Sequence, residues 1–595
     1  MKKNFKMLLS VMLCLMLSLT GCSTPQNNNN DLPQETIAEA QQKIRAEFDD
    51  FLIQQTREIV TSDGLSFHFS VYDPQSLGIE EIPQTLGDLS DQQQTRDQQD
   101  MVETLEELRH FDLDQLSSTQ QLDYQLLERA LTQSLDMLVY SDLQFLFEPS
   151  QGIINGLNQN FLEFRLETEE DVELYLVLLS DVERYVEQAL EETRKQARQG
   201  YFLQDFTLDE TLQEIRRFIE KEEDNALIIN FNEKLEEIDL SEQQKETYRQ
   251  ENRQIMLEHY LPSYQKACDI LESLRGSNKA EGGLALAYGD EGREYYELLM
   301  NAKAGTDMTA QDLAVELEDF VIRKLTRMGE LQQEDPQLFE KMEEFSFTMN
   351  DAEEILKLHE EMMTTVVPAI PEIPYQVSVL DSSIISEDTI AYYLIPPMDK
   401  ATENVIKINP RYTSDLETLF ITLAHEGFPG HLYQRNYYQN TDPSPIRSVL
   451  SEIGYTEGWA VLIELEAYHW SGLEEDLIEA FQINMMYGYY LNCLCDVIVN
   501  GLGWDEAQLK DYLTNFGIGD SAHDIYESVI SNPGVLLPYG VGEMKLEKMK
   551  TDAEIQLEKE YSDKEFYTVI LDNGPRPFDY VRKDVDNWIM NKMKH

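Results

Sequence analysis

The stretch TLAHEGFPGHLYQ, residues 422–434, constrains this chain more than any other. It contains two of the nine histidines, His425 and His431, and Glu426 directly follows the first of them. The apolar run at residues 419–421 leads into it, which is typical of a buried helix that carries polar side chains at its end. Neutral imidazoles and a carboxylate are the ligands and the base that a zinc hydrolase needs. The stretch therefore predicts a helix that ends at a metal site.

The spacing of the two histidines differs from the His-Glu-x-x-His pattern. In that pattern the histidines are four residues apart and differ by about 40° around the helix. His425 and His431 are six residues apart, so on a straight helix they would point to different faces. Pro429 lacks an N–H and would clash with the His425 carbonyl, and Gly430 loosens the backbone further. We therefore expect a two-residue bulge at Pro429-Gly430 that returns His431 to the face of His425.

A second informative helix is expected at residues 452–466. Glu457 follows His425 by 32 residues, which leaves room for a loop and an antiparallel return towards the metal. Glu464 lies on the same face two turns later, and it is a candidate for holding a ligand imidazole by a hydrogen bond. The alternative for Glu457 is a surface or helix-capping carboxylate.

The remaining sequence is mainly helical in pattern, with one exception after Pro368. We predict a mainly α fold in which a small antiparallel sheet precedes the active-site helix, and a match to a capping box at Ser414–Glu417 would open that helix. The chain would divide into an N-terminal helical lobe over about 35–367 and a catalytic lobe over 368–595. Apolar residues recur at helical spacing over Glu35–Thr56, Thr168–Gln199, Leu208–Glu222, Glu242–Leu274 and Met308–Glu334. The expected strands, rich in Val, Ile and Tyr, are Tyr375–Leu380, Ile390–Ile395 and Asn404–Ile408.

Residues 1–21 are typical of a targeting segment. Three lysines precede an apolar stretch at residues 7–19 that is too short to span a bilayer. The sequence LTGC, which ends at Cys22, resembles the lipobox of bacterial lipoproteins, and this implies cleavage before Cys22 and acylation of its thiol. The alternative is an ordinary secretory signal. We expect a flexible tether at residues 22–34 and a lipid-anchored protein on the extracytoplasmic face of the cell membrane.

The net charge of the chain argues against one class of partner. At −65 it opposes nucleic acid binding, because phosphate groups require a basic surface. A strongly solvated exterior explains this charge.

The two central helices resemble a bacterial family labelled domain of unknown function 885. Its members carry His-Glu-x-x-Pro-Gly-His followed by a Glu-Gly-Trp-Ala helix, and both motifs stand in this chain, at residues 425–431 and 457–460. This family is grouped by likeness with the gluzincin metallopeptidases, so the resemblance implies a large helical gluzincin-like fold. It extends from about residue 35 to the end of the chain and includes weaker matches at residues 289–296, 538–540 and 571–575.

The resemblance also implies roles for individual residues. His425, His431 and Glu457 would be the ligands of one Zn²⁺ ion per chain, and Glu426 would be the general base. Tyr539 matches a family tyrosine that would donate a hydrogen bond to the oxyanion.

The sequence departs from the family at three places. Leu432 stands where many relatives have a second histidine, and Asn500 stands where a histidine is expected. Arginines expected on the helix of residues 493–496 are absent. These departures concern substrate contacts and leave the expected ligands and base in place.

We predict a membrane-anchored zinc peptidase that hydrolyses extracytoplasmic peptides with a metal-activated water. Two histidines and a glutamate favour zinc over manganese or cobalt, and a strand beside the metal can bind an extended peptide. The sequence leaves open whether cleavage occurs at a chain end or internally. The main alternative is a non-catalytic peptide-binding or scaffold lipoprotein on a degenerate peptidase fold. A third hypothesis is a metal-dependent amidase that acts on cell-wall peptides.

Overall fold

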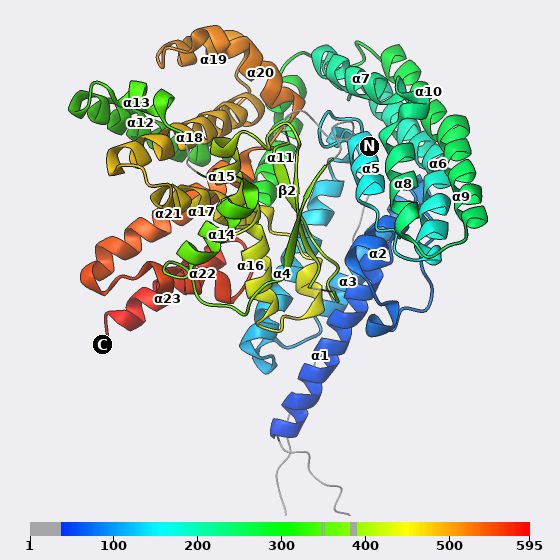
Figure 1. Ribbon diagram of the computed structural model, residues 1–595, viewed down its shortest axis with the longest axis horizontal. Helices are drawn as coiled ribbons and strands as arrows, with labels where there is room; N and C mark the ends of the chain where they lie inside the picture. Colours follow the sequence, from blue (N-terminus) through cyan, green and yellow to red (C-terminus); the bar gives the residue numbers. More distant parts are fainter. Residues whose placement is uncertain (1–36, 347–348, 350, 381–388, 401, 595) are drawn as a thin grey trace, which may run out of the picture.

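Figure 1 shows the protein as a computed structural model that describes residues 37–346, 349, 351–380, 389–400 and 402–594. The prediction of a mainly helical chain with one small sheet is confirmed. The expected signal segment 1–21, the tether and the lipidation site Cys22 lie outside the described residues. Within those ranges, no helix combines the length and the apolar character that a membrane crossing requires.

Of the helices that precede the sheet, α1 to α10 form two groups. α1 to α4 pack together below, and α5 to α10 form a curved layer on the right of Figure 1. The predicted helix at 242–274 is divided by a π-helical turn at Met256–Tyr260. The helices are α1 (Ile37–Val60), α2 (Gly64–Ser70), α3 (Asp91–Leu108), α4 (Ser118–Leu138), α5 (Ile153–Glu163), α6 (Glu169–Gln199), α7 (Asp205–Ile219), α8 (Ala226–Glu237), α9 (Glu242–Ile255), α10 (Leu261–Ser273), α11 (Leu284–Ala304), α12 (Ala310–Glu334), α13 (Leu338–Glu344) and α14 (Ala352–Met363).

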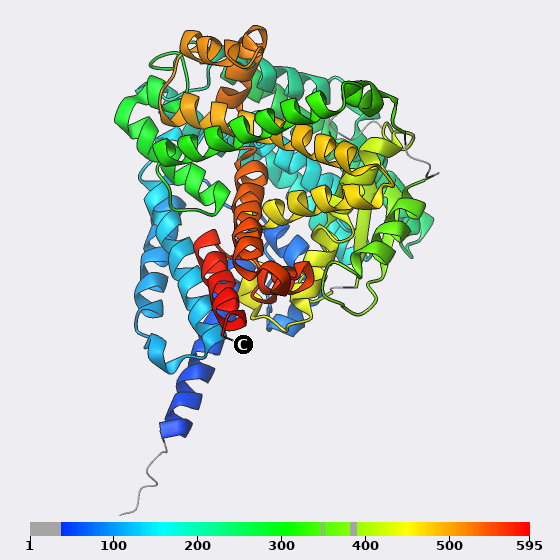
Figure 2. The same ribbon diagram turned by 90° about the vertical axis from the view of Figure 1, so that its left-hand side faces the viewer.

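The second half of the chain contributes the helices that surround the predicted site. Figure 2 shows α12 and α18 running together across the molecule, with α21 below them at a steep angle. The helices are α15 (Leu416–Glu426), α16 (His431–Gln439), α17 (Ile453–Ala467), α18 (Glu475–Asp496), α19 (Glu506–Thr514), α20 (Ala522–Ser531), α21 (Leu537–Leu557), α22 (Asp563–Asp572) and α23 (Phe578–Lys592).

One hydrophobic cluster joins the two halves. It contains Leu317 of α12, Val461 of α17, Tyr490 of α18 and Val541 of α21, all fully buried. Residues from both sides of position 367 therefore share this cluster. The division into two lobes at this position stays a prediction.

Capping side chains open both α6 and α15. The hydroxyl of Thr168 accepts a hydrogen bond from the Asp171 backbone N–H at 3.1 Å, and the Asp171 carboxylate accepts one from the Thr168 N–H at 3.0 Å. A capping box therefore opens α6, and the predicted helix over Thr168–Gln199 is confirmed. The capping box at Ser414 is wrong, because the N-cap of α15 is Asp415, whose carboxylate accepts from the Thr418 N–H at 3.2 Å. A carboxylate serves this position as well as a hydroxyl does.

The sheet has the three predicted strands but not the predicted directions. β1 (Tyr375–Val379) pairs parallel with β3 (Asn404–Ile408), and β2 (Ala391–Leu394) pairs antiparallel with β3. The sheet is therefore mixed, in the order β1-β3-β2, and β2 is an edge strand. The prediction of an antiparallel sheet failed because side chains alternate between the two faces in the same way for either direction.

Helices α17 and α21 cross at very close distance. A Cβ atom on Gly458 would lie 2.4 Å from the backbone carbonyl carbon of Gly542, and one on Gly542 would lie 2.2 Å from the carbonyl oxygen of Gly454. Only glycine at these positions permits this approach. Because α17 carries Glu457 and α21 carries Tyr539, the crossing brings these two predicted site residues to one place.

Replacing Gly458 with alanine is expected to destabilise the protein by about 3 kcal/mol, since the new methyl group meets backbone that cannot move aside. Gly488→Ala in α18 is the matched control, because its Cβ would have no neighbour within 4 Å. There alanine is expected to stabilise the helix by up to about 1 kcal/mol. Denaturant unfolding of both variants measures the difference. Equal midpoints for the two would contradict the close crossing.

Candidate metal centre

The two histidines stand on either side of a helix break. α15 ends at Glu426, and α16 begins at His431 after a turn that contains a cis peptide bond before Pro429. The expected bulge within one helix is therefore wrong: there are two helices. A Cβ on Gly430 would lie 1.8 Å from the carbonyl oxygen of His425, so glycine lets the chain fold back over the end of α15.

Trp459 supports this turn from the neighbouring helix. Its indole N–H donates a hydrogen bond to the Pro429 carbonyl at 2.9 Å, and its side chain is completely buried. It lies two residues after Glu457 on α17. The helix that presents Glu457 therefore also holds the turn that separates His425 from His431.

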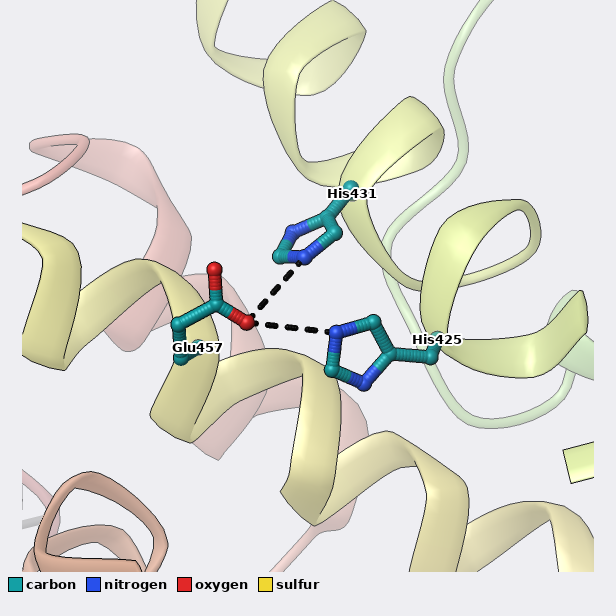
Figure 3. Close-up of side chains that lie close together, drawn as sticks. All are labelled: His425, His431 and Glu457. Atoms are coloured by element: carbon teal, nitrogen blue, oxygen red, sulfur yellow. Dashed lines mark hydrogen bonds and ion pairs between the residues drawn. The ribbon is translucent and has the colours of Figure 1, made fainter. Parts of the chain in front are cut away.

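Figure 3 shows that the side chains of His425, His431 and Glu457 converge on one point. The Oε2 atom of Glu457 lies 3.2 Å from Nε2 of His425 and 3.4 Å from Nε2 of His431. One potential ligand atom from each residue lies within 4.8 Å of the other two. The three predicted ligands are thus brought together from α15, α16 and α17.

The donor set fits a zinc ion. Two ligand atoms bound to one tetrahedral zinc at about 2.0–2.2 Å lie about 3.3 Å apart, and both distances from Glu457 are close to this value. Nδ1 of His425 is engaged by the Glu464 carboxylate. A carboxylate in this position fixes the Nδ1 proton and the orientation of the ring, so that Nε2 is the nitrogen that would face a metal. Glu464 therefore lies behind the imidazole of His425, which is one of the predicted ligands.

The electrostatics of the cluster suit a cation. Burial opposes a charge on His425, but the carboxylates of Glu464 and Glu457 raise its pKa well above the ordinary value. Burial likewise opposes ionisation of Glu457, yet hydrogen bonds from His425 and His431 hold its pKa well below the usual range. Burial raises the pKa of Glu464. The carboxylates thus create a negative potential at the point where the imidazoles meet.

Glu426 lies at the edge of the cluster and is fixed by the sheet. Its Oε1 atom is 4.0 Å from Nε2 of His425, and its Oε2 atom accepts a hydrogen bond from the Tyr393 backbone N–H at 2.8 Å. Tyr393 belongs to β2, so the edge strand orients this carboxylate. Glu426 therefore stands beside the three donors without joining their closest contacts.

Tyr539 of α21 lies against the ring of His425. The ring centroids are 6.1 Å apart and the planes differ by 20°, and Tyr489 stacks on Tyr539 at 6.0 Å. Burial raises the pKa of Tyr539. Its phenol therefore keeps its proton and can donate a hydrogen bond near the cluster.

A cavity of about 750 Å³ opens on these residues. Its walls come from α5, the edge strand β2 with the residues that follow it, α16 and the beginning of α17. Leu432 is fully buried in the core, and Asn500 donates to the carboxylate of Asp496 at 2.8 Å. Neither of these departures from the family lines the cavity.

Several contacts at the site were not predicted from the sequence, and only some of the residues involved carry a sequence signal. Tyr393 holds Glu426 through its backbone N–H, which any residue except proline provides. Arg435, which also lines the cavity, follows His431 by four residues and so shares its helix face; that spacing could have marked it. Trp459 and Pro429 were both visible as parts of motifs, but the hydrogen bond between them was not.

Two solved structures are similar to this fold. One, described as "the putative lipoprotein from Colwellia psychrerythraea", has a TM-score of 0.80 at 18% identity and covers 92% of this chain and 100% of that chain. The other, described as "a putative lipoprotein of unknown function from Shewanella oneidensis", has a TM-score of 0.56 at 18% identity and covers 90% of this chain and 98% of that chain. At this identity the likeness shows a shared fold. No curated protein matches the chain.

The family model described as "Bacterial protein of unknown function (DUF885)" matches residues 74–585. The match includes every predicted ligand, the predicted base and Tyr539. It spans most of the chain, and the chain therefore belongs to the bacterial DUF885 family.

Proposed function

We propose that this protein is a zinc-dependent peptidase of gluzincin type, anchored through a lipid on Cys22 outside the cytoplasm. The observation that carries the proposal is the spacing of three donors, His425, His431 and Glu457, which suits one zinc ion. The lipid anchor is supported by the lipobox-like sequence and by the descriptions of the two similar structures as lipoproteins.

The side chains around the three donors supply the remaining chemistry. Zinc held by them would polarise the scissile carbonyl and make the attacking water more acidic. Glu426 accepts the proton of this water on a carboxylate oxygen and delivers it to the leaving nitrogen. Tyr539 donates its O–H to the carbonyl oxygen as negative charge develops there. Glu464 keeps the imidazole of His425 oriented by accepting its Nδ1 proton.

A peptide substrate is supported by the form of the cavity. Its volume of about 750 Å³ is within the range of known ligand pockets, about 300–1,000 Å³. One side of β2 pairs with β3, and residues of β2 line the cavity. An extended peptide can add to such an edge through its backbone.

The mature protein, purified in detergent, is expected to contain one zinc ion per chain and to hydrolyse peptides from a random library. A chelator should abolish hydrolysis, and added zinc should restore it. Elemental analysis and mass spectrometry of the products measure both results.

The alternatives give different outcomes in the same experiment. Zinc or peptide binding without any hydrolysis would favour the non-catalytic scaffold. Cleavage of cell-wall muropeptides, with linear peptides left intact, would favour the amidase.

A further inference from the structure

Two buried hydrogen-bond donors on α16 lack acceptors. Within the described residues, Nε2 of Gln434 and Nη1 of Arg435 have no hydrogen-bond partner. Gln434 is buried and Arg435 is half-buried, and both line the 750 Å³ cavity. Buried polar groups in native proteins almost always have partners. Two such donors side by side in one cavity indicate that an acceptor arrives with a ligand.

The surroundings of Arg435 differ from those of other buried arginines in this chain. The buried Arg447 pairs with the carboxylate of Asp123 at 3.3 Å, and the buried Arg576 pairs with Asp584 at 2.9 Å. No carboxylate of the described chain lies within 4.0 Å of the Arg435 guanidinium, which donates to the Pro396 carbonyl at 2.7 Å. Charged groups removed from water normally require an opposite charge.

The other polar neighbour of Arg435 does not supply that charge. The guanidinium interacts with the phenol of Tyr393, whose hydroxyl donates to Asn404 Oδ1 at 2.5 Å. Burial raises the pKa of Tyr393 to about 12, so the phenol stays neutral. In a chain with 112 acidic residues and 47 lysines and arginines, the absence of a carboxylate at this guanidinium is therefore informative.

Both donors lie next to the candidate metal centre. They follow His431 by three and four residues on the same helix, and residues at this spacing are neighbours on one face, with Cβ atoms about 5–6 Å apart. An extended peptide advances about 3.3–3.6 Å per residue. A group bound by Gln434 and Arg435 would therefore belong to a substrate residue one or two positions from the bond at the metal.

The cavity has a wall close to Arg435. Two residues after Pro396, the Met398 backbone N–H donates to the Ser70 carbonyl at 2.9 Å, and both residues line the cavity. Asp399 then accepts from the N–H groups of Tyr72 and Asp73, each at 2.7 Å. These contacts join the strand segment to the N-terminal helices. A wall at this place favours the end of a chain over a continuous one.

We propose that Arg435 and Gln434 bind the terminal carboxylate of a peptide substrate. This inference rests on the proposed peptidase function and makes it more specific. A carboxylate accepts hydrogen bonds from both donors and supplies the charge that Arg435 lacks. The enzyme then removes one or two residues from the carboxyl end of a peptide.

A binding experiment tests the site without turnover. N-acetylated tetra-alanine with a free carboxylate and the same peptide with an amidated end are titrated into full-length Glu426→Gln protein, with and without zinc. The free acid should bind about 10–100-fold more tightly. Adding Arg435→Gln should reduce this ratio to less than about threefold, whereas Arg435→Lys should keep part of it. Arg293→Gln, at an exposed arginine outside the cavity, should keep the full ratio.

Hydrolysis by the active protein distinguishes a failure of the carboxylate site from a failure of the proposed peptidase function. The expected result is cleavage of acetylated peptides with a free carboxylate, with release of single residues or dipeptides, and a similar loss of preference in Arg435→Gln. Equal cleavage of acids and amides, or a requirement for a free amino end, would overturn the carboxylate site and leave the peptidase standing. If nothing is hydrolysed, the peptidase proposal fails, and the ratio measured in the binding experiment alone decides the carboxylate site.

Discussion

Replacing Glu426 with glutamine is expected to leave zinc binding intact and to lower kcat for peptide hydrolysis by about 1000-fold. Glutamine keeps the size of the side chain, and its amide oxygen can still accept the hydrogen bond from the Tyr393 N–H. It has no basic oxygen to take a proton from water. Zinc content by elemental analysis and kcat on one defined peptide measure the two properties in the same preparation.

The control for this prediction lies on the same helix. Glu417 is exposed in the first turn of α15, and Glu417→Gln makes the same chemical change away from the cluster. It should retain the wild-type kcat. Full activity in Glu426→Gln would show that this carboxylate is not the general base. Loss of zinc from the same variant would show that Glu426 contributes to metal binding instead.

Replacing Glu457 with glutamine is expected to weaken zinc binding by more than about 100-fold. The variant loses the oxygen that lies between the two imidazoles, at 3.2 and 3.4 Å, and with it the negative charge that favours a cation. Loss of a group that only supports a ligand typically costs 10–100-fold in affinity, so the loss of a ligand should exceed this. Competition against a fluorescent zinc chelator measures the dissociation constant.

A graded series makes this prediction specific. Glu464→Gln, which keeps all three ligands but changes the support of His425, should weaken zinc binding by about 10–100-fold. Glu417→Gln should leave it unchanged. If Glu457→Gln binds zinc as tightly as the wild type, the three converging side chains do not form the metal site.

Local patterns in the sequence predicted several helices, among them α1, α6 and α12, because the signals are contained within each segment. The apolar period alone is sufficient to predict α6. The three strands were visible in the same way, from residue type. Their directions were not, since the partner of β1 is decided by packing between segments far apart in the chain.

The candidate site was predictable where chemistry depends on residue type and spacing. His425, Glu426 and Glu457 could be selected because few other residue types bind metals or move protons. The geometry between them could not be derived, because Pro429 and Gly430 permit either a bulge or a complete break. The role proposed for Arg435 needed the structure as well, since only the structure shows that no carboxylate reaches it.

The hydrogen bond from Trp459 to Pro429 has a mechanical consequence. It joins the turn between α15 and α16 to the helix of Glu457, so that the segments carrying the three predicted ligands are held to one another by a buried contact. A smaller side chain in place of Trp459 would therefore disturb the positions of His425 and His431 relative to Glu457 without changing any of these three residues.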